Sequence, residues 1–232
     1  MRPVEFTSGP GSAAQPLATL GVLGDIHVED ERLETGIRWL QAQGTDRIVH
    51  VGDVCDGRGS LTRTLALLHE HRIEGIGGNH ERWFLARAMR ELRLAHPVEA
   101  LTPSVEVALT ALPAQRLLHT IEGPLLLCHG VGEDDMLVLR PDTPLGAIAG
   151  SPALQRLLAW DELRFVVAGH THVHSVQQVG HLAWINAGTL KYDDAPVVTR
   201  IDLERREVGF AQLACPAQIG DVERRALPDR MS

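Results

Sequence analysis

Five short segments of this sequence carry side chains of the metal-binding type, and each follows an apolar run rich in β-branched residues. They are Gly24-Asp25-Ile26-His27, Gly52-Asp53-Val54-Cys55-Asp56, Gly78-Asn79-His80-Glu81, Cys128-His129-Gly130 and Gly169-His170-Thr171-His172. Such runs predict strands, and polar side chains at the ends of parallel strands emerge at one edge of a sheet. The order therefore predicts an α/β protein whose distant segments converge on one site.

The first part of the chain alternates between strand and helix patterns. The predicted strands span residues 17–23, 47–51 and 73–76, and the predicted helices span residues 31–43 and 61–71. This alternation favours βαβ units and a largely parallel sheet.

The remainder has a different pattern. The middle predicts helices at residues 81–94 and 98–109, a hairpin of residues 116–121 and 124–128, a loop over residues 131–150 and a short helix at residues 154–160. Consecutive strands are then predicted at residues 165–168, 173–179, 181–186, 197–202 and 207–213. We expect a flexible leader over residues 1–16, one domain over residues 17–215, and a polar, loosely held tail over residues 216–232.

Composition narrows the class of partner. The chain has 232 residues, with 22 Lys and Arg against 30 Asp and Glu, and a formal net charge of −8. We see no dense basic stripe, so a long nucleic acid is not the expected partner. No run approaches the length of a membrane span, and no membrane partner is predicted. The widely spaced Cys55, Cys128 and Cys215 do not suggest a disulfide framework, which favours a reducing compartment and a cytoplasmic protein.

The candidate ligands form a mixed oxygen and nitrogen set without thiolate. They are Asp25, His27, Asp53, Asn79, His129, His170 and His172. Such a set suits Mn²⁺, Fe or Zn²⁺ better than Ca²⁺ or a structural Zn²⁺ cluster. Seven side chains exceed the needs of one ion and predict two divalent ions that share a bridging carboxylate. Asp53 is the expected bridge because it has no neighbouring His at its own strand end.

The order of these motifs closely resembles that of the calcineurin-like metallophosphoesterase superfamily. The segment Ile185-Asn186-Ala187-Gly188-Thr189 also looks like the Asn-Pro-Gly-Ser segment of its small bacterial members. The resemblance implies a four-layer α/β/β/α sandwich with two central sheets. It implies one ion held by Asp25, His27, Asp53 and His172, and a second held by Asp53, Asn79, His129 and His170.

The same resemblance assigns roles to three further residues. His80 is then not a ligand but the general acid that protonates the leaving group, and imidazole suits that role near neutral pH. Asp56 resembles the carboxylate that orients this His in phosphoprotein phosphatases. Gly57 separates Asp56 from Arg58, so Arg58 either clamps the phosphate or points elsewhere.

Together these features predict a hydrolase of phosphate esters that uses a metal-bridging hydroxide. The expected substrate is a phosphomonoester, either a phosphoprotein or a small nucleotide. Gly-Asn-His-Glu is similar to the motif of phosphoprotein phosphatases and diadenosine tetraphosphatases, whereas the small bacterial phosphodiesterases often carry Cys in place of His80. The alternatives are a phosphodiesterase, a dinucleoside polyphosphate hydrolase and a non-catalytic protein-binding scaffold, and the presence of every ligand and of His80 favours an enzyme.

Other residues near the motifs have two interpretations. His174 is as well explained by a solvent-facing strand position as by a place in the site. Cys55 and Cys128 are predicted to pack in the core. Trp83 and Phe84 are also expected in the core, with the substrate cleft as the alternative.

Overall fold

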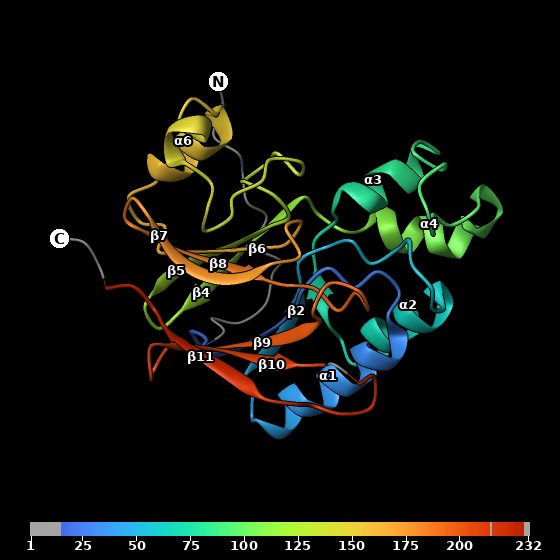
Figure 1. The fold of residues 1–232 in the computed structure, drawn as a ribbon, viewed down its shortest axis with the longest axis horizontal. Coiled ribbons are helices and arrows are strands. Elements are labelled where there is room, and N and C mark those ends of the chain that lie inside the picture. The colour runs from blue at the N-terminus through green and yellow to red at the C-terminus, as the bar shows by residue number, and fades with distance from the viewer. Residues whose placement is uncertain (1–14, 214, 230–232) are drawn as a thin grey trace.

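A computed structural model describes residues 15–213 and 215–229, so nearly all of the predicted leader lies outside the described residues. The described strands form two sheets (Figure 1). The 6-stranded sheet has the order β11-β10-β9-β1-β2-β3, and the 5-stranded sheet has the order β4-β5-β6-β8-β7. Strands β1, β2 and β3 run parallel, as do β5, β6 and β8, and the other pairs are antiparallel.

The strands have the following bounds. The first sheet contains β1 (Thr19–Leu23), β2 (Arg47–His50), β3 (Glu74–Gly75), β9 (Val197–Asp202), β10 (Glu207–Gln212) and β11 (Val222–Ala226). The second contains β4 (Gln115–Thr120), β5 (Gly123–Cys128), β6 (Phe165–Ala168), β7 (His174–Val179) and β8 (Leu182–Ala187). The helices are α1 (Asp30–Ala42), α2 (Leu61–Glu70), α3 (Asn79–Leu85), α4 (Pro103–Thr110), α5 (Leu145–Ile148) and α6 (Pro152–Leu158), with a 3₁₀ turn at Val98–Ala100.

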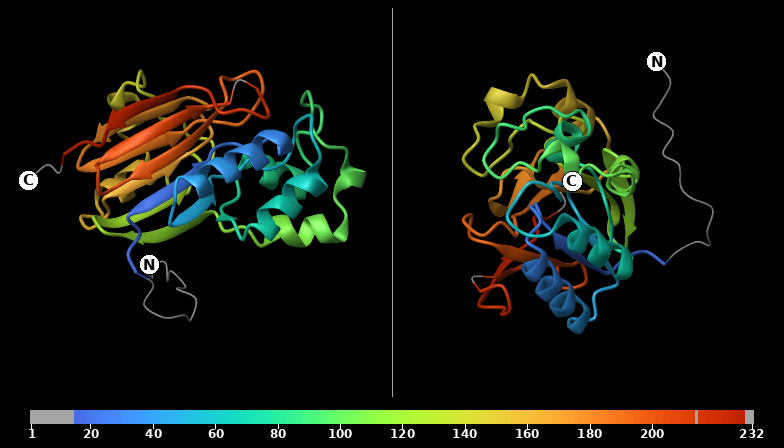
Figure 2. Two further views of the ribbon diagram at one scale, coloured as in Figure 1. Left: turned by 90° about the horizontal axis from the view of Figure 1, so that it is seen from below. Right: turned by 90° about the vertical axis from the view of Figure 1, so that its right-hand side faces the viewer.

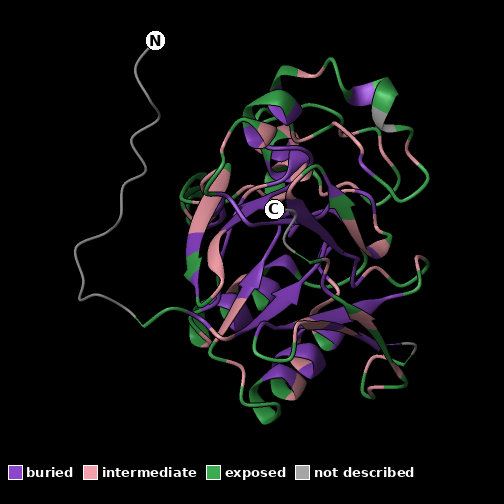
Figure 3. Cartoon of the chain, turned by 90° about the vertical axis from the view of Figure 1, so that its left-hand side faces the viewer, coloured by how far each residue is buried: buried purple, intermediate pink, exposed green. Residues whose placement is uncertain are grey.

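Three apolar layers hold these elements together. Side chains such as Val22 of β1 and Val167 of β6 pack between the two sheets. Helices α1 and α2 cover the outer face of the 6-stranded sheet, and α6 covers the outer face of the other sheet, where Trp184 is fully buried. Figure 3 shows the buried strands along this sandwich. The α/β/β/α architecture is therefore as predicted.

Helices α3 and α4 lie beyond one end of the two sheets (Figure 2). The predicted helix over residues 81–94 is wrong beyond Leu85, because α3 ends there and Arg87 and Met89 adopt positive φ angles of 54° and 52°. The predicted helix over residues 98–109 is interrupted as well. Thr102 caps a new helix whose first residue is Pro103, a residue that starts a helix more easily than it continues one.

Two other segments differ from the expectation. The predicted loop over residues 131–150 contains the short helix α5. Within the tail that we expected to be loosely held, residues 222–226 form β11, which pairs antiparallel with β10 at the edge of the sheet. This strand was missed because it consists mostly of charged residues, and edge strands tolerate charge on both faces.

Candidate metal centre

The predicted ligands lie in the loops that follow the parallel strands. Asp25 follows β1, Asp53 follows β2, His129 follows β5 and His170 follows β6. The backbone turns sharply at these points, and Asp53 and His170 have positive φ angles of 46° and 62°. A non-glycine residue in this region costs about 1–3 kcal/mol and persists where the surroundings enforce it, commonly at functional sites.

The structure brings the predicted ligands into two groups that share one carboxylate. Within each group the ligand atoms lie within 4.8 Å of one another. One group contains Asp25, His27, Asp53 and His172, and the other contains Asp53, His129 and His170. Asn79 joins the second group, because its Oδ1 lies 2.9 Å from Nε2 of His129.

The atoms of the first group that face inward are all hydrogen-bond acceptors, because the outer ring nitrogens already donate to other groups. Nδ1 of His27 donates to the main-chain carbonyl of Asp56 at 2.8 Å, and Nδ1 of His172 donates to the Asp194 carboxylate at 2.6 Å. In a neutral imidazole the other nitrogen then carries a lone pair. These two Nε2 atoms nevertheless face each other at 3.1 Å, and the nearby Oδ2 of Asp25 is buried without a hydrogen-bond partner. A bound cation would give all three atoms a partner.

The second group has the same character. Nδ1 of His129 donates to the carbonyl of Val51 at 2.7 Å, so its Nε2 faces inward as an acceptor. Around that nitrogen lie Oδ1 of Asn79 at 2.9 Å and Oδ2 of Asp53 at 3.3 Å. Converging acceptors with their outer hydrogen bonds already made are what a bound metal requires of its ligands. Both groups therefore fit a divalent cation.

The electrostatics of the protein alone agree with this fit. Burial raises the pKa of Asp25 to about 7, although the nearby His129 opposes the shift. Burial also opposes ionisation of Asp53, but in the protein without metal His129 is protonated on both nitrogens, and its charge and hydrogen bond, with the charges of His80 and His27, lower the pKa of Asp53 below its usual range. A divalent cation would supply the positive charge that these two buried carboxyls share, and it would displace the proton from Asp25.

The segments at residues 52–56 and 78–81 can approach each other closely because residue 78 is a glycine. A Cβ at Gly78 would lie 2.4 Å from Oδ1 of Asp53. Glu81, which follows Asn79 and His80, then fastens the two segments together. Its Oε1 accepts hydrogen bonds from the main-chain N–H groups of Val54 and Cys55 at 2.7 and 3.0 Å, and its Oε2 accepts from Gly78 at 2.8 Å. Glu81 thus positions ligands without facing the cluster.

His80 lies beside the two groups and is bound to Asp56. Its Nδ1 donates to Oδ2 of Asp56 at 2.8 Å, while its Nε2 lies 4.0 Å from Oδ2 of Asp53. Burial lowers the pKa of His80, but the bond to Asp56 and the nearby negative charges of Asp53, Asp56 and Glu81 together outweigh burial, and the net shift is upward. This arrangement leaves the outer nitrogen of His80 available to a substrate in the cleft.

Sequence reasoning missed two residues that hold Asp56. Arg90 donates from its two terminal nitrogens to the two carboxylate oxygens at 2.9 Å each, and the main-chain N–H of His96 donates to Oδ1 at 2.8 Å. With the bond from His80, these donors occupy about as many acceptor positions as a carboxylate has. Arg90 belongs to the segment where a helix was predicted, and His96 lies between that segment and the next predicted helix, so neither position gave a signal of its own. Asp194, which orients His172, was missed for a similar reason.

A cleft of about 460 Å³ opens at His27, His80 and His172. Arg58 lines it, and its guanidinium lies 5.0 Å from the centre of the Tyr192 ring. Trp83 also lines the cleft, with its ring 5.0 Å from that of His80, whereas Phe84 is buried in the core.

Three weaker predictions can also be placed. His174 lies on β7, outside both ligand groups, and its Nε2 lies 3.1 Å from Glu223. Cys55 and Cys128 are buried in apolar clusters, as predicted.

Comparison with known proteins decides the family. A family model described as the calcineurin-like phosphoesterase superfamily domain matches residues 19–206, which is most of the chain. The chain belongs to this superfamily. The resemblance predicted from the motifs is thereby confirmed, and the protein is a metal-dependent phosphoesterase.

Solved structures share the fold of this phosphoesterase at low sequence identity. A metallophosphoesterase from Sphaerobacter thermophilus is 16% identical with a TM-score of 0.62, over 84% of this chain and 88% of that chain. A hypothetical protein from Pyrococcus horikoshii is 14% identical with a TM-score of 0.65, over 84% and 87%. The phosphoesterase Yfce from E. coli is 17% identical with a TM-score of 0.52, over 88% and 98%.

A search of curated proteins finds no match for this phosphoesterase. Among the described residues, no helix combines the length and the apolar character that crossing a bilayer requires.

Proposed function

We propose that this phosphoesterase hydrolyses phosphomonoesters at a two-metal centre. The observation that carries the proposal is the pair of groups of inward-facing acceptor atoms that share Asp53, with the unpartnered Oδ2 of Asp25 lying 3.2 Å from Nε2 of His172. The first ion would be held by Asp25, His27, Asp53 and His172, and the second by Asp53, Asn79, His129 and His170. The donor set suits Mn²⁺, Fe or Zn²⁺.

The centre would provide the nucleophile and bind the phosphate. When bound, two divalent ions lower the pKa of water from about 15.7 toward neutrality and neutralise charge on phosphate oxygens. The protein itself fixes the positions of these side chains. Asp56 accepts a hydrogen bond from His80 and orients its ring, and Asp194 does the same for His172. Glu81 fixes the turn after Asp53.

His80 is the proposed general acid. It lines the cleft beside the candidate ligands, and Asp56 holds its Nδ1 so that Nε2 faces outward. An alkoxide leaving group needs a proton as it departs, and a positioned imidazole contributes about 10²–10⁴-fold to such a step. Asp56, kept in place by Arg90 and His96, is the positioning residue.

Arg58 supports a monoester rather than a diester as the substrate. Its guanidinium lies at the cleft and has no acidic partner among the described residues. A monoester carries one more charged oxygen than a diester, and a guanidinium is the side chain best suited to receive it. The substrate would be a small phosphorylated molecule, such as a nucleotide, or a phosphoprotein.

The choice between esters is tested by comparing p-nitrophenyl phosphate with its bis ester in the presence of Mn²⁺. Arg58→Gln should lower kcat/KM for the monoester about ten- to a hundredfold and leave the diester nearly unchanged, since a charge-assisted contact contributes roughly 1.5–3 kcal/mol. Arg38→Gln, on the exposed side of α1, is the matched control and should change neither rate. Preference of the wild type for the bis ester would instead identify a phosphodiesterase.

The cysteines agree with the cytoplasmic location that we propose. Cys55, Cys128 and Cys215 are free, and the first two lie in separate buried clusters. Buried unpaired thiols are typical of proteins from reducing compartments.

A further inference from the structure

A second cavity lies near the same end of the molecule as the cleft at the candidate metal centre. It has a volume of about 730 Å³, lies between α2, the β2–β3 edge and the α4 region, and shares no lining residue with the cleft. Cavities that take small-molecule ligands commonly have about 300–1,000 Å³ and apolar walls with a few polar groups. This cavity has that size and that composition.

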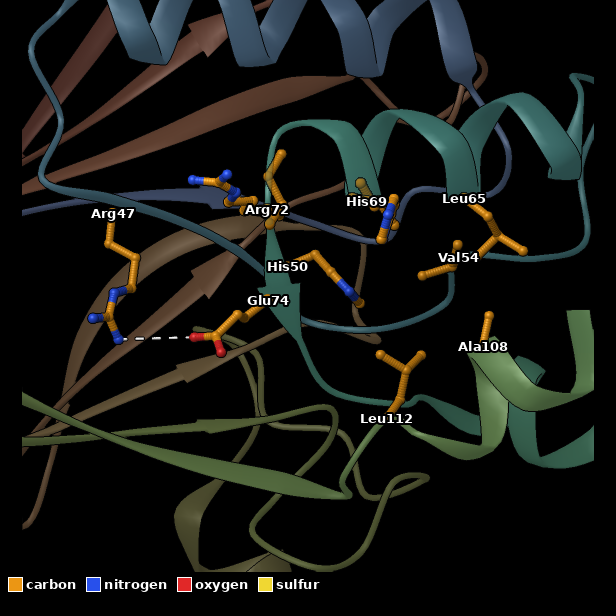
Figure 4. A pocket seen from close by; sticks show the side chains of 11 residues that line it. Arg47, His50, Val54, Leu65, His69, Arg72, Glu74, Ala108 and Leu112 are labelled. Carbon is orange, nitrogen blue, oxygen red and sulfur yellow. Dashed lines mark ion pairs between the residues drawn. The ribbon is translucent and has the colours of Figure 1, made fainter. Parts of the chain in front are cut away.

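The two ends of the cavity differ in chemistry (Figure 4). Val54, Leu65, Ala108 and Leu112 form one end with apolar side chains. The other end holds charged side chains, among them an arginine that follows α2.

Positive charge predominates at the charged end. Glu74 lies 3.8 Å from Arg47 and 3.5 Å from Arg116, so one carboxylate is shared by two guanidinium groups. The side chain of Arg72 has no hydrogen-bond or ion-pair partner in the part of the chain that the structure describes. An anionic group would complement this end of the cavity.

His50 lies between the two ends and points into the cavity (Figure 4). Its side chain is about 1% exposed. Nδ1 accepts a hydrogen bond from the main-chain N–H of Gly52 at 3.4 Å, so a neutral ring carries its proton on Nε2. That N–H has no partner among the described residues. The N–H can therefore donate to water or to an acceptor group on a molecule bound in the cavity.

The position of the His50 ring is fixed by the neighbouring strand. A Cβ at Gly75 would lie 2.2 Å from Nε2 of His50, so only glycine allows the ring to pack against β3. Burial, and after it the charge of Arg116, lower the pKa of His50 to about 4. The ring is therefore neutral at ordinary pH and offers one N–H donor.

We propose that this cavity binds an amphipathic monoanion, with an apolar body against Val54, Leu65 and Ala108 and an acidic head group toward Arg72 and the N–H of His50. The ligand class comprises aromatic or aliphatic carboxylates and sulfonates of drug-like size. A neutral apolar molecule would leave the charge of Arg72 and the donor of His50 unmatched.

Two fluorescent probes that share one ring system test this proposal. 8-Anilinonaphthalene-1-sulfonate carries an anionic head group, and N-phenyl-1-naphthylamine is the same body without it. We expect saturable one-site binding of the sulfonate to the metal-loaded protein, about tenfold or more tighter than that of the neutral probe, since a contact with a charged donor has this magnitude. Equal affinity for the two probes, or no saturable binding of the sulfonate, would overturn the proposal.

Substitutions locate the probe. Ala108→Trp fills the apolar end and should abolish binding of both probes, whereas Val107→Trp, one residue away and 71% exposed, should leave both unchanged. Arg72→Gln should weaken the sulfonate about tenfold and leave the neutral probe as it was. Unchanged binding in Ala108→Trp, or an equal loss in Val107→Trp, would place the probe elsewhere. Since the cavity is separate from the cleft, hydrolysis by each variant reports independently that the protein is folded.

Discussion

Replacing Arg90 tests whether its hydrogen bonds to the Asp56 carboxylate contribute to proton transfer by His80. Arg90→Met removes two charge-assisted hydrogen bonds of 2.9 Å to Asp56. It keeps an unbranched apolar side chain beside Phe84, whose ring centre lies 5.1 Å from the guanidinium carbon of Arg90. Asp56 keeps its bonds from His80 and from the main chain of His96. The carboxylate therefore stays partly held, but its orientation is no longer fixed from both sides.

The size of the effect follows from what remains. Breaking a buried ion pair costs about 3–5 kcal/mol when nothing else compensates the charge. Here two of the four donors to Asp56 remain, so we expect roughly half of that free energy to be lost. The loss should raise the activation barrier, because Asp56 then orients His80 less well. A rise of about 1.4–2.8 kcal/mol in the activation barrier corresponds to a ten- to hundredfold lower kcat. KM should hardly change, because Arg90 is not a lining residue of the cleft.

The assay compares an alkyl phosphate with p-nitrophenyl phosphate, whose leaving group departs without a proton. Arg90→Met should lose kcat mainly on the alkyl ester, and Arg90→Lys, which restores the charge without the bidentate geometry, should recover part of it. Arg87→Met is the control, since Arg87 is exposed on the same segment and has no acidic partner among the described residues. Equal losses on both esters, or the same loss in the control, would refute the reasoning.

Three other perturbations test separate parts of the structure. Asp53→Asn should lose at least one of two bound Mn²⁺ ions and most turnover; retention of both ions with full activity would contradict the bridging role. His80→Ala should keep both ions and slow alkyl ester hydrolysis about 10²–10⁴-fold, with a smaller effect on aryl esters. His50 binds a proton in the unfolded chain below its pKa of 6.5 but in the folded protein only below about 4, so its contribution to stability is lost as pH falls through this window. His50→Gln should remove up to about 3 kcal/mol of this pH dependence in urea titrations at pH 4 to 7, and unchanged dependence would contradict it.

Much of the fold could be predicted from the chain because its strands carry strong local signals. The apolar runs before Asp25, Asp53, His129 and His170 identify parallel strands, and parallel strands place their following loops at one edge. The convergence of these residues therefore follows from the topology, and the structure brings them together. Their roles as metal ligands remain predictions.

What could not be predicted lies in segments whose conformation depends on distant partners. Residues 86–97 have helix-forming composition, yet the chain leaves the helix so that Arg90 and His96 reach Asp56. Tertiary contacts of this kind override local propensity. The same is true of β11, whose charged residues give no alternating pattern but whose backbone completes the pairing of β10.

The segment over residues 86–97 also limits how this protein can diversify. It carries Leu92, Arg93 and Leu94 into the cleft, and before and after them it carries Arg90 and His96, the two residues that hold Asp56. Exchanging this loop for another, in nature or by design, would change the surface offered to the leaving group and at the same time release the proposed acid. New specificity therefore has to arise by substitution at positions 92 to 94 while Arg90 and His96 are kept. The alternative is a different loop that supplies its own hydrogen-bond donors to Asp56.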